Sequence, residues 1–386
     1  METVVVATDL DDSAAAGREL GEQIAASQLD GTDAVILFAS PKYDHGTLLR
    51  ELQQTCSPGV IIGSSSAGEF TRDRRSEGMA CAMALRAPEM QFSAGSGQGL
   101  GQDAADVARQ IVSGFRGKSG SAYRHRAALI LTDALAGHAD RLVEELALAT
   151  SGQYQFFGGG AGDNAQFQRT VVFAGTQAFT NGAVALEILS EKPLGIGVSH
   201  GWQPASHGLR VTEADGMRVI SLNGLPAIEA FQEHAERTGQ SLDPQAPIPF
   251  FLHNILGINL AAGHQLRVPL AVDDDGSVLC AAEVPAGSVV HIMRSSAQSA
   301  AEAAARATES ALKALGTSRP NAALMFDCVA TRLRLGDEFD VELAAVKSKL
   351  NGINLAGCNT HGQIARAEGQ FEGFHNCTAV VCVLPE

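Results

Sequence analysis

Three glycine-rich stretches place hydroxyl, amide and carboxyl side chains directly after short apolar runs. They cover residues 63–69, 158–164 and 357–363. Glycine allows positive φ angles and leaves backbone N–H groups uncovered, so turns of this kind can hold a small polar ligand. The side chains that we expect to contact such a ligand are Ser64, Ser65, Ser66, Glu69, Asp163, Asn164, Asn359, Thr360, His361 and Gln363.

Three of these side chains stand at one equivalent position, directly after the last glycine of each stretch. They are Glu69, Asp163 and Gln363. Each can accept hydrogen bonds that order its own turn, or it can meet an amine on a ligand. A lining that mixes acid, amide and hydroxyl groups suits a ligand of the amino-acid type. The alternative is that the three turns are only tight connections between strands.

The same stretches carry little that indicates an enzyme. Residues 63–67 do not match the G-x-S-x-G turn of serine hydrolases, and the glycines between 95 and 101 lack the spacing of a phosphate-binding loop. A weaker alternative is a Ser or Cys enzyme that uses Ser65, Cys358 and His361. A Cys358 nucleophile needs a nearby His or a lowered thiol pKa. We therefore expect a binding protein without catalytic residues.

Further candidate contacts lie outside the turns. His200 stands two residues before Trp202, the only tryptophan, and His375 with Asn376 opens the last predicted strand. Each of these histidines can equally be a packed, hydrogen-bonded residue of the fold. His253 follows three apolar residues, which favours a core histidine or an axial ligand to haem. The chain has no Cys-x-x-Cys-His motif, so any haem would be held non-covalently.

Composition narrows the class of partner. The 386 residues are 45% apolar and 18% charged, which is typical of a well-packed globular protein. The net charge of -15 repels nucleic acid and anionic membranes. The N-terminal residues lack the features of a secretory signal, no apolar run is long enough for membrane insertion, and seven cysteines without a zinc spacing fit reduced, buried thiols. We expect a cytoplasmic protein without a bound metal.

Alternating apolar runs and helical patterns predict an α/β fold built from three copies of a β-α-β-α-β-turn-β unit. The first unit covers strands at 3–8, 34–39, 60–62 and 79–85 with helices at 14–28 and 45–56. The second covers strands at 90–94, 127–132, 154–157 and 183–189 with helices at 103–115 and 138–150. Gly68 and Gly162 lie 94 residues apart, as do Ala34 and Ala128. This common spacing indicates duplication.

The third unit is expected to begin with a strand at 289–293 and to continue with helices at 299–315 and 339–350 and strands at 322–326, 353–355 and 377–384. Residues 193–288 have a different pattern, with short strands, one helix and several prolines. We expect them to form an inserted, mostly β module between the second and third units.

Motifs along nearly the whole chain resemble the FIST sensor family. The stretches that carry the resemblance are 63–69, 159–163 with Phe167, 181–185, 195–202, 211–212, 223–227, 275–277, 284–288, Cys328 and 375–376. The resemblance implies a FIST N-terminal domain at 1–215, which holds two repeats, and a FIST C-terminal domain at 216–386. Two positions depart from the family pattern: Ser64 replaces a common Cys, and residues 360–363 differ in the third turn.

The resemblance also implies a function. It predicts a bacterial cytoplasmic sensor that binds a small molecule and regulates a separately encoded signalling protein. The alternative within the family is a haem b protein that senses nitric oxide and regulates a histidine kinase. From the repeats themselves we expect the three turns to lie at the carboxyl ends of strands and to converge on one site. The module that carries His200 and Trp202 is expected to cover that site as a lid.

Overall fold

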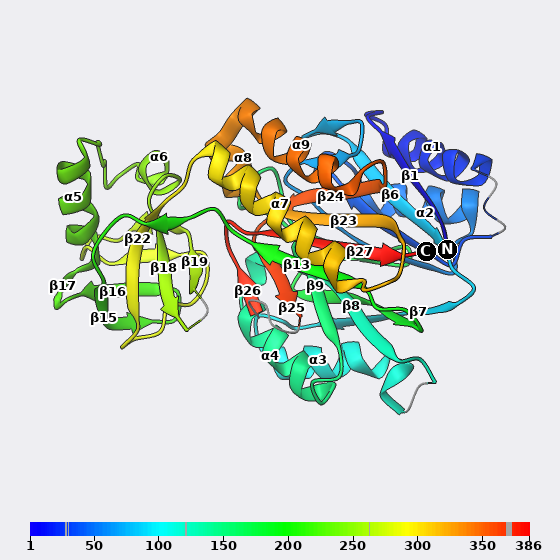
Figure 1. Ribbon diagram of the computed structural model, residues 1–386, viewed down its shortest axis with the longest axis horizontal. Coiled ribbons are helices and arrows are strands. Elements are labelled where there is room, and N and C mark those ends of the chain that lie inside the picture. The colour runs from blue at the N-terminus through cyan, green and yellow to red at the C-terminus, as the bar shows by residue number, and fades with distance from the viewer. Residues whose placement is uncertain (28, 30, 120–121, 262, 368–372) are drawn as a thin grey trace.

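The computed structural model describes residues 1–386 except 28, 30, 120–121, 262 and 368–372. Its sheets are mixed and its helices lie between strands, so the predicted α/β class is confirmed. Within the described residues, three six-stranded sheets form a body, and a fourth sheet forms a β module at one end of it, at the left of Figure 1.

The first sheet of the body contains the N-terminal strands in the order β1-β6-β2-β3. β2 and β3 are parallel, whereas β6 runs antiparallel to both β1 and β2. Two helices connect these strands, and each begins at an aspartate whose carboxylate accepts a backbone N–H of the first turn, at Asp12 and Asp44. The elements are β1 (Glu2–Thr8), α1 (Ser13–Ala26), β2 (Ala34–Ala39), α2 (His45–Cys56), β3 (Val60–Ser65) and β6 (Ala80–Arg86).

The second sheet repeats this arrangement in the order β7-β12-β8-β9. The parallel pair is now β8 and β9, and β12 runs antiparallel to β7 and β8. The elements are β7 (Met90–Gln98), α3 (Ala104–Ser113), η1 (Gly117–Ser119), β8 (His125–Thr132), η2 (Ala134–Ala136), α4 (Ala139–Ala149), β9 (Gln155–Gly160) and β12 (Gly182–Ser190).

The third sheet has the corresponding order β13-β27-β23-β24. Its elements are β13 (Gly195–Ser199), α7 (Ala297–Ala314), β23 (Pro320–Cys328), α8 (Val329–Leu335), η3 (Gly336–Glu338), α9 (Phe339–Leu350), β24 (Asn354–Thr360) and β27 (Ala379–Pro385).

The first strand of this third sheet is not the one that the sequence predicted. Val289–Met293 was expected there, but this stretch lies in β22 of the module, while β13 pairs with β27. The module is therefore inserted within the third unit, after its first strand, and not between the second and third units. Glycine explains why β13 occupies this position in the third sheet. A Cβ at Gly197 would lie 1.8 Å from the carbonyl oxygen of Ala307, so only glycine lets α7 pack this close to the strand.

Over its described residues the module is an antiparallel sheet with the helices α5 and α6. Its main strand order is β19-β18-β22-β15-β16-β21-β20. The elements are β14 (Gln203–Pro204), β15 (Leu209–Asp215), β16 (Arg218–Leu222), β17 (Leu225–Pro226), α5 (Ala227–Thr238), α6 (Ile248–Phe251), β18 (Ile255–Leu260), β19 (Gly263–Arg267), β20 (Pro269–Val272), β21 (Val278–Cys280) and β22 (Val289–Arg294).

Each sheet of the body is completed by a hairpin from another unit, and we call these three the exchanged hairpins. The hairpin after β3 adds to β24, the one after β9 adds to β3, and the one after β24 adds to β9. The result is a closed ring in which every unit gives one hairpin and receives one. The hairpins are β4 (Glu69–Thr71) with β5 (Arg75–Ser76), β10 (Val172–Ala174) with β11 (Gln177–Phe179), and β25 (Gln363–Arg366) with β26 (Gly373–His375).

The three sheets of the body enclose one apolar core. Phe38 of the first sheet, Phe157 of the second and Phe326 of the third are fully buried within it. The Phe326 ring meets Phe38 edge-on at 5.6 Å between centroids and Phe157 at 6.3 Å. The opposite face of each sheet is covered by its own helices, such as α3 and α4 on the second sheet (Figure 1). This two-sided burial explains why the strands are apolar almost throughout.

Candidate functional site

The three glycine turns meet in the body. The Ala67 N–H donates to the Asn359 carbonyl at 2.9 Å, and the Gly162 N–H donates to the Ser65 carbonyl at 2.9 Å. The second and third turns are joined by the Gly160 N–H, which donates to the Gly362 carbonyl at 2.9 Å. Each turn is thus hydrogen-bonded to both others, and the exchanged hairpins that follow the turns bring them together.

Close backbone approach explains one of the glycines. A Cβ at Gly162 would lie 2.6 Å from the Ala67 nitrogen, so a side chain there would separate the first and second turns. The contact between turns therefore depends on residues without side chains.

The acidic and amide residues that follow the three turns are buried and hold the neighbouring backbone. Glu69 accepts the Met79 N–H at 3.1 Å. Asp163 accepts three N–H groups, from residues 167, 168 and 169, at 2.7–3.0 Å. Gln363 accepts the Thr378 N–H at 3.2 Å. The equivalent positions thus share one structural role, ordering the segment beyond the turn.

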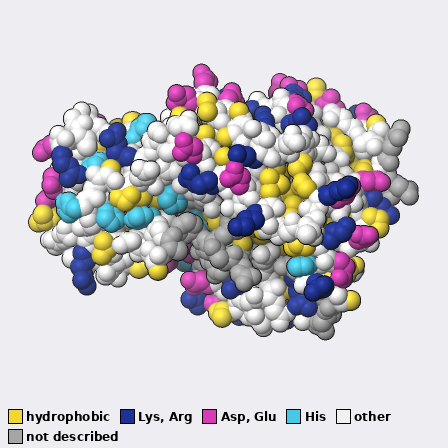
Figure 2. All heavy atoms as spheres, viewed as in Figure 1, with side chains coloured by type: hydrophobic (Ala, Val, Ile, Leu, Met, Phe, Trp, Pro, Cys, Tyr) yellow, Lys and Arg dark blue, Asp and Glu magenta, His cyan; other side chains and the backbone are white. Residues whose placement is uncertain are grey.

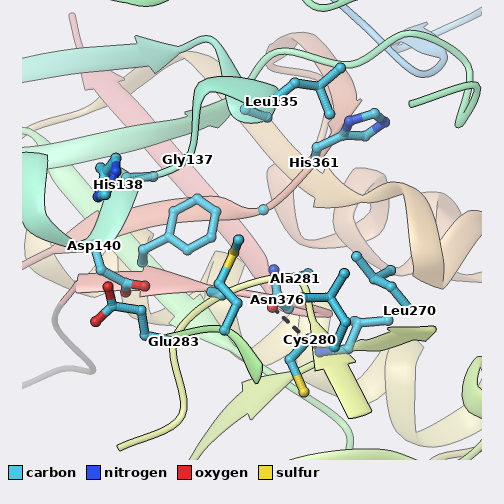
Figure 3. A pocket seen from close by; sticks show the side chains of 18 of the residues that line it. Leu135, Gly137, His138, Asp140, Leu270, Cys280, Ala281, Glu283, His361 and Asn376 are labelled. Atoms are coloured by element: carbon cyan, nitrogen blue, oxygen red, sulfur yellow. Dashed lines mark hydrogen bonds between the residues drawn. The ribbon is translucent and has the colours of Figure 1, made fainter. Parts of the chain in front are cut away.

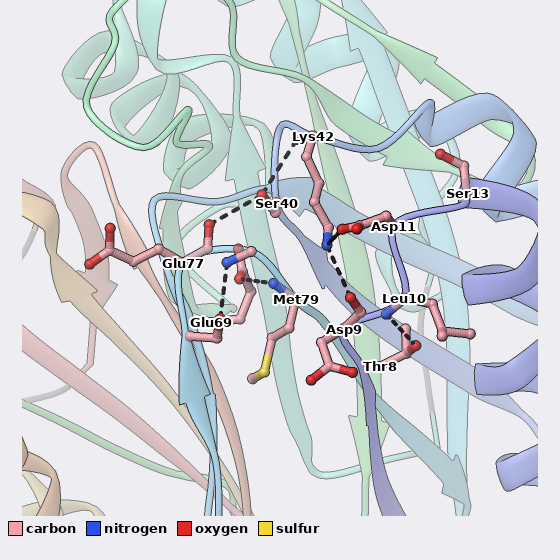
Figure 4. A network of polar contacts seen from close by, with 12 residues as sticks. Thr8, Asp9, Leu10, Asp11, Ser13, Ser40, Lys42, Glu69, Glu77 and Met79 are labelled. Atoms are coloured by element: carbon pink, nitrogen blue, oxygen red, sulfur yellow. Dashed lines mark hydrogen bonds and ion pairs between the residues drawn. The ribbon is translucent and has the colours of Figure 1, made fainter.

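Glu69 is the carboxyl whose pKa burial changes most clearly among the three positions. It is fully buried, and the Ser66 hydroxyl donates to its second carboxyl oxygen. Burial raises the pKa of Glu69 to about 8, against the lowering effect of Ser66, the Met79 N–H and Arg332. Figure 4 shows this carboxyl beside Met79, close to the surface network of Asp9, Asp11 and Lys42.

The hydroxyl and amide side chains of the turns are similarly enclosed. Ser65 accepts the Val171 N–H at 2.9 Å, and the Thr360 hydroxyl donates to the Asp327 carbonyl at 3.0 Å. Ser64 Oγ and Asn359 Nδ2 are buried without a hydrogen-bond partner in the described part of the chain. Asn164 lies nearer the surface and donates to the Glu77 carbonyl at 2.9 Å. Contact between these side chains and a ligand stays a prediction.

A cavity of about 410 Å³ lies between the body and the module (Figure 3). Of the predicted contact residues, His361 and Asn376 line it. Its wall is mainly apolar, with Leu135, Phe374 and Leu270 among its larger side chains. The full lining is Ala134–Asp140, Phe167, Gly216, Met217, Val268, Leu270, Leu279–Glu283, Cys328–Ala330, His361, Gly362, Phe374 and Asn376.

His361 is the most distinctive polar group of this cavity. Its side chain is 6% exposed, and its ring stacks on Phe167 with centroids 4.8 Å apart. Burial lowers the pKa of His361 to about 4, and the Asp163 carboxylate, 3.5 Å away, only partly opposes this. Neither ring nitrogen has a hydrogen-bond partner among the described residues. The wall of the cavity therefore contains a neutral imidazole whose two nitrogens are buried.

His200 and Trp202 lie at the junction of body and module but line a separate, smaller cavity. His200 Nε2 lies 3.0 Å from the His264 carbonyl oxygen, and the Arg334 guanidinium covers the Trp202 ring at 5.1 Å. Figure 2 shows further histidine side chains gathered across this face of the module. The pair contributes to the junction, and its predicted role in a lid stays a prediction.

His375 and Asn376 are both buried, at 3% and 2% exposure. His375 pairs with Gln363 across β25 and β26. The Asn376 side-chain oxygen lies 3.5 Å from the Val268 nitrogen, so this residue connects the body to the module. By contrast, His253 is exposed, which is contrary to the expected core position.

In the described structure, the three groups of the enzyme alternative, Ser65, Cys358 and His361, do not line a common cavity. Cys358 is fully buried, and burial raises the pKa of its thiol. Ser65 is 1% exposed, and its hydroxyl oxygen accepts a hydrogen bond from the Val171 N–H. Of the three proposed groups only His361 lines the cavity.

The sequence did not reveal several polar residues of this region. Asp140, at the start of α4, and Glu283, in the module, line one end of the cavity, and Arg267 is buried behind them. Asp327 and Glu342 form a buried carboxyl pair whose pKa values burial raises. A signal was available in the segment after β8, where Asp133, Gly137, His138 and Asp140 follow the strand within eight residues.

The described residues show neither a candidate metal site nor a candidate membrane-spanning helix. They contain no group of three or more His, Cys, Asp or Glu placed to hold a metal ion. Within the same residues, every helix is too short or too polar to span a membrane.

Comparison with known proteins relates the chain to one family. The FIST N domain matches residues 33–225, and the FIST C domain matches residues 227–366. Uncharacterized proteins of Mycobacterium bovis and Mycobacterium tuberculosis are each 28% identical over 219 residues, which is 54% of this chain and 55% of theirs. The chain thus spans about half the length of the curated relatives it matches.

Two solved structures show a distant likeness. They are a cyanuric acid hydrolase from A. caulinodans, with a TM-score of 0.37, and a chorismatase, with a TM-score of 0.36. Each is 10% identical and covers 99% of this chain, with 99% and 98% of their own chains covered. Likeness at this level carries no argument about function.

Proposed function

Because the chain belongs to the FIST family, whose domains are small-ligand-binding signalling sensors, we propose that it binds a small metabolite in the cavity between body and module. The ligand is an amino acid or a related metabolite. Binding regulates a separately encoded signal-transduction partner in the cytoplasm.

The observation that carries this proposal is the position of the cavity. Its wall comes from the body, through residues such as Leu135 and His361, and from the module, through residues such as Met217 and Leu270. A ligand there contacts both parts, so it can favour one arrangement of the module over another. Differential affinity for two arrangements is what a sensor requires. The volume and the mainly apolar wall also fit a small-molecule site.

We also propose that the body arose by duplication of one β-α-β-α-β-turn-β unit. The 94-residue spacing between the first two turns and the common strand order of the three sheets support three copies of one unit.

Filling the cavity tests the proposed function. Ala281→Trp places an indole against the cavity wall and is expected to weaken binding at least tenfold. The measurement is native mass spectrometry of protein purified from its host, together with a thermal-shift screen of amino acids and related metabolites. Ala25→Trp, at an exposed position of α1, is the matched control. A ligand that both variants retain equally places binding elsewhere.

A haem b sensor of nitric oxide that regulates a histidine kinase is the second candidate. The observation that favours it is His361, a neutral imidazole in the cavity wall whose nitrogens make no hydrogen bond within the described residues, since haem iron is commonly held by a neutral histidine. When bound, haem would supply the iron that coordinates nitric oxide.

Haem titration decides this candidate. The protein is expected to develop a Soret band that His361→Ala abolishes and that the exposed-site variant His253→Ala leaves unchanged. A band that is identical in the two variants removes His361 as the axial ligand and this candidate with it.

A further inference from the structure

The charged groups of the cavity gather at one end. The walls are formed mainly by apolar side chains, while Asp140 and Glu283 place two carboxylates together at the edge (Figure 3). Asp140 is partly buried and Glu283 is exposed. The two carboxylates also interact electrostatically. Burial is the main cause that raises the pKa of Asp140, and the negative charge of Glu283 raises it further.

The buried guanidinium of Arg267 partly neutralises the negative charge at this end of the cavity. Arg267 is 3% exposed, and its Nη2 lies 3.2 Å from Asp140 Oδ1. Its other nitrogens donate to backbone carbonyls, including that of Glu283 at 2.8 Å. Arg267 is therefore committed to the protein and does not line the cavity. Two carboxylates against one guanidinium leave about one negative charge at this end, reduced in part by the positive end of α4.

The rest of the lining offers little to a ligand carboxylate. No Lys or Arg belongs to the lining that the described residues form. The described lining contains two histidines: His138, directly before α4, and His361, whose buried imidazole is neutral. Asn376 adds an uncharged amide. An anion placed near Asp140 and Glu283 would meet like charges, which disfavours binding. An ammonium group at the same point would satisfy both carboxylates.

We infer that the cavity selects an amine with an apolar body and no free carboxylate, with its ammonium group between Asp140 and Glu283 and its body against Leu135, Phe374 and Leu270. This inference rests on the proposed function and narrows its ligand from amino acids to their carboxylate-free amine relatives. His361 contributes a buried, neutral ring to the wall of the same cavity.

Four probes of one shape test the inference by calorimetry. They are 2-phenylethylamine, 2-phenylethanol, 3-phenylpropionate and phenylalanine. The amine is expected to bind at least tenfold more tightly than each of the other three. Glu283→Gln should weaken the amine about fivefold or more and leave the alcohol unchanged. Glu233→Gln, an exposed carboxylate elsewhere on the module, is the matched control and should change neither.

The pH dependence gives a second readout. Burial raises the pKa of Asp140 above the ordinary carboxyl value, and the charged groups that act on it are Arg267, Glu283 and Glu144. His138 is the titratable group beside it in the lining. Lowering the pH through that raised pKa protonates Asp140 and removes the attraction. The affinity for 2-phenylethylamine should therefore fall as the medium becomes acidic, while that for 2-phenylethanol should stay constant.

Two outcomes overturn the inference. In the first, the alcohol, the carboxylate or phenylalanine binds as tightly as the amine; if Ala281→Trp also abolishes that binding, the proposed function still stands. In the second, none of the four probes binds. A metabolite that is retained in native mass spectrometry and lost in Ala281→Trp would then preserve the proposed function without the amine preference.

Discussion

Replacing Glu69 with glutamine is expected to stabilise the protein at neutral and alkaline pH. The folded-state pKa of Glu69 is raised to about 8 from an ordinary value of 4.5, because the carboxyl is fully buried. The folded state therefore binds the proton more tightly than the unfolded state. The stability that this tighter proton binding gives to the folded state is fully present below the ordinary pKa of 4.5. It is lost as the pH rises through the folded-state pKa of about 8. Glutamine is neutral throughout, so the gain should be about 4 kcal/mol at pH 8.

Glutamine can also keep the local hydrogen bonds. Its carbonyl oxygen can accept the Met79 N–H, and its amide can donate to the Ser66 hydroxyl, which the present carboxyl already contacts. The measurement is the free energy of unfolding in urea from pH 5 to pH 9. Glu213→Gln, an exposed carboxylate of β15, should leave the pH profile unchanged. A Glu69→Gln profile that falls as steeply as that of the original protein would contradict the assignment.

Phe326→Ala is expected to lower the free energy of unfolding by about 3–5 kcal/mol, because it removes a fully buried ring and leaves a cavity. Phe326 is the ring that touches both Phe38 and Phe157, so its loss affects all three sheets of the body. Denaturant unfolding followed by far-ultraviolet circular dichroism gives the magnitude.

Leu148→Ala is the control for this effect, since Leu148 is 72% exposed on α4. It should change the stability by less than about 0.5 kcal/mol. A Phe326→Ala cost as small as that of Leu148→Ala would show that the three sheets do not depend on a shared core.

The sequence predicted the local elements of the body well because each has a local signal. β2 is a run of buried apolar residues, and α1 begins at Asp12, a residue of the type that caps helices. The partner of a strand has no such signal. β13 and β22 are both short and apolar, and only the packing of α7 against Gly195 and Gly197 identifies β13 as the strand of the body.

The candidate site was predictable in part for the same reason. Glycine and polar residues marked the three turns, and two of the predicted contacts line the cavity: His361, within the third turn, and Asn376, directly after β26. The rest of the lining consists of ordinary apolar residues such as Leu270 and Ala281, which come together only when the module packs against the body. Asp140 was not noticed because an acid in the first turn of a helix is common without any ligand.

The exchanged hairpins also determine when the body can be completed during synthesis. The free edge of β3 is covered by β10, about 110 residues further along the chain, and that of β9 is covered by β25, about 200 residues further. Until Gln363–Arg366 leaves the ribosome, the second sheet presents an uncovered strand edge, and the β4–β5 hairpin waits for β24. Uncovered edges are the surfaces through which nascent chains aggregate. A chain that stops before the third unit thus leaves both earlier units incomplete, so strand edges and a hairpin stay without their partners until translation is nearly finished.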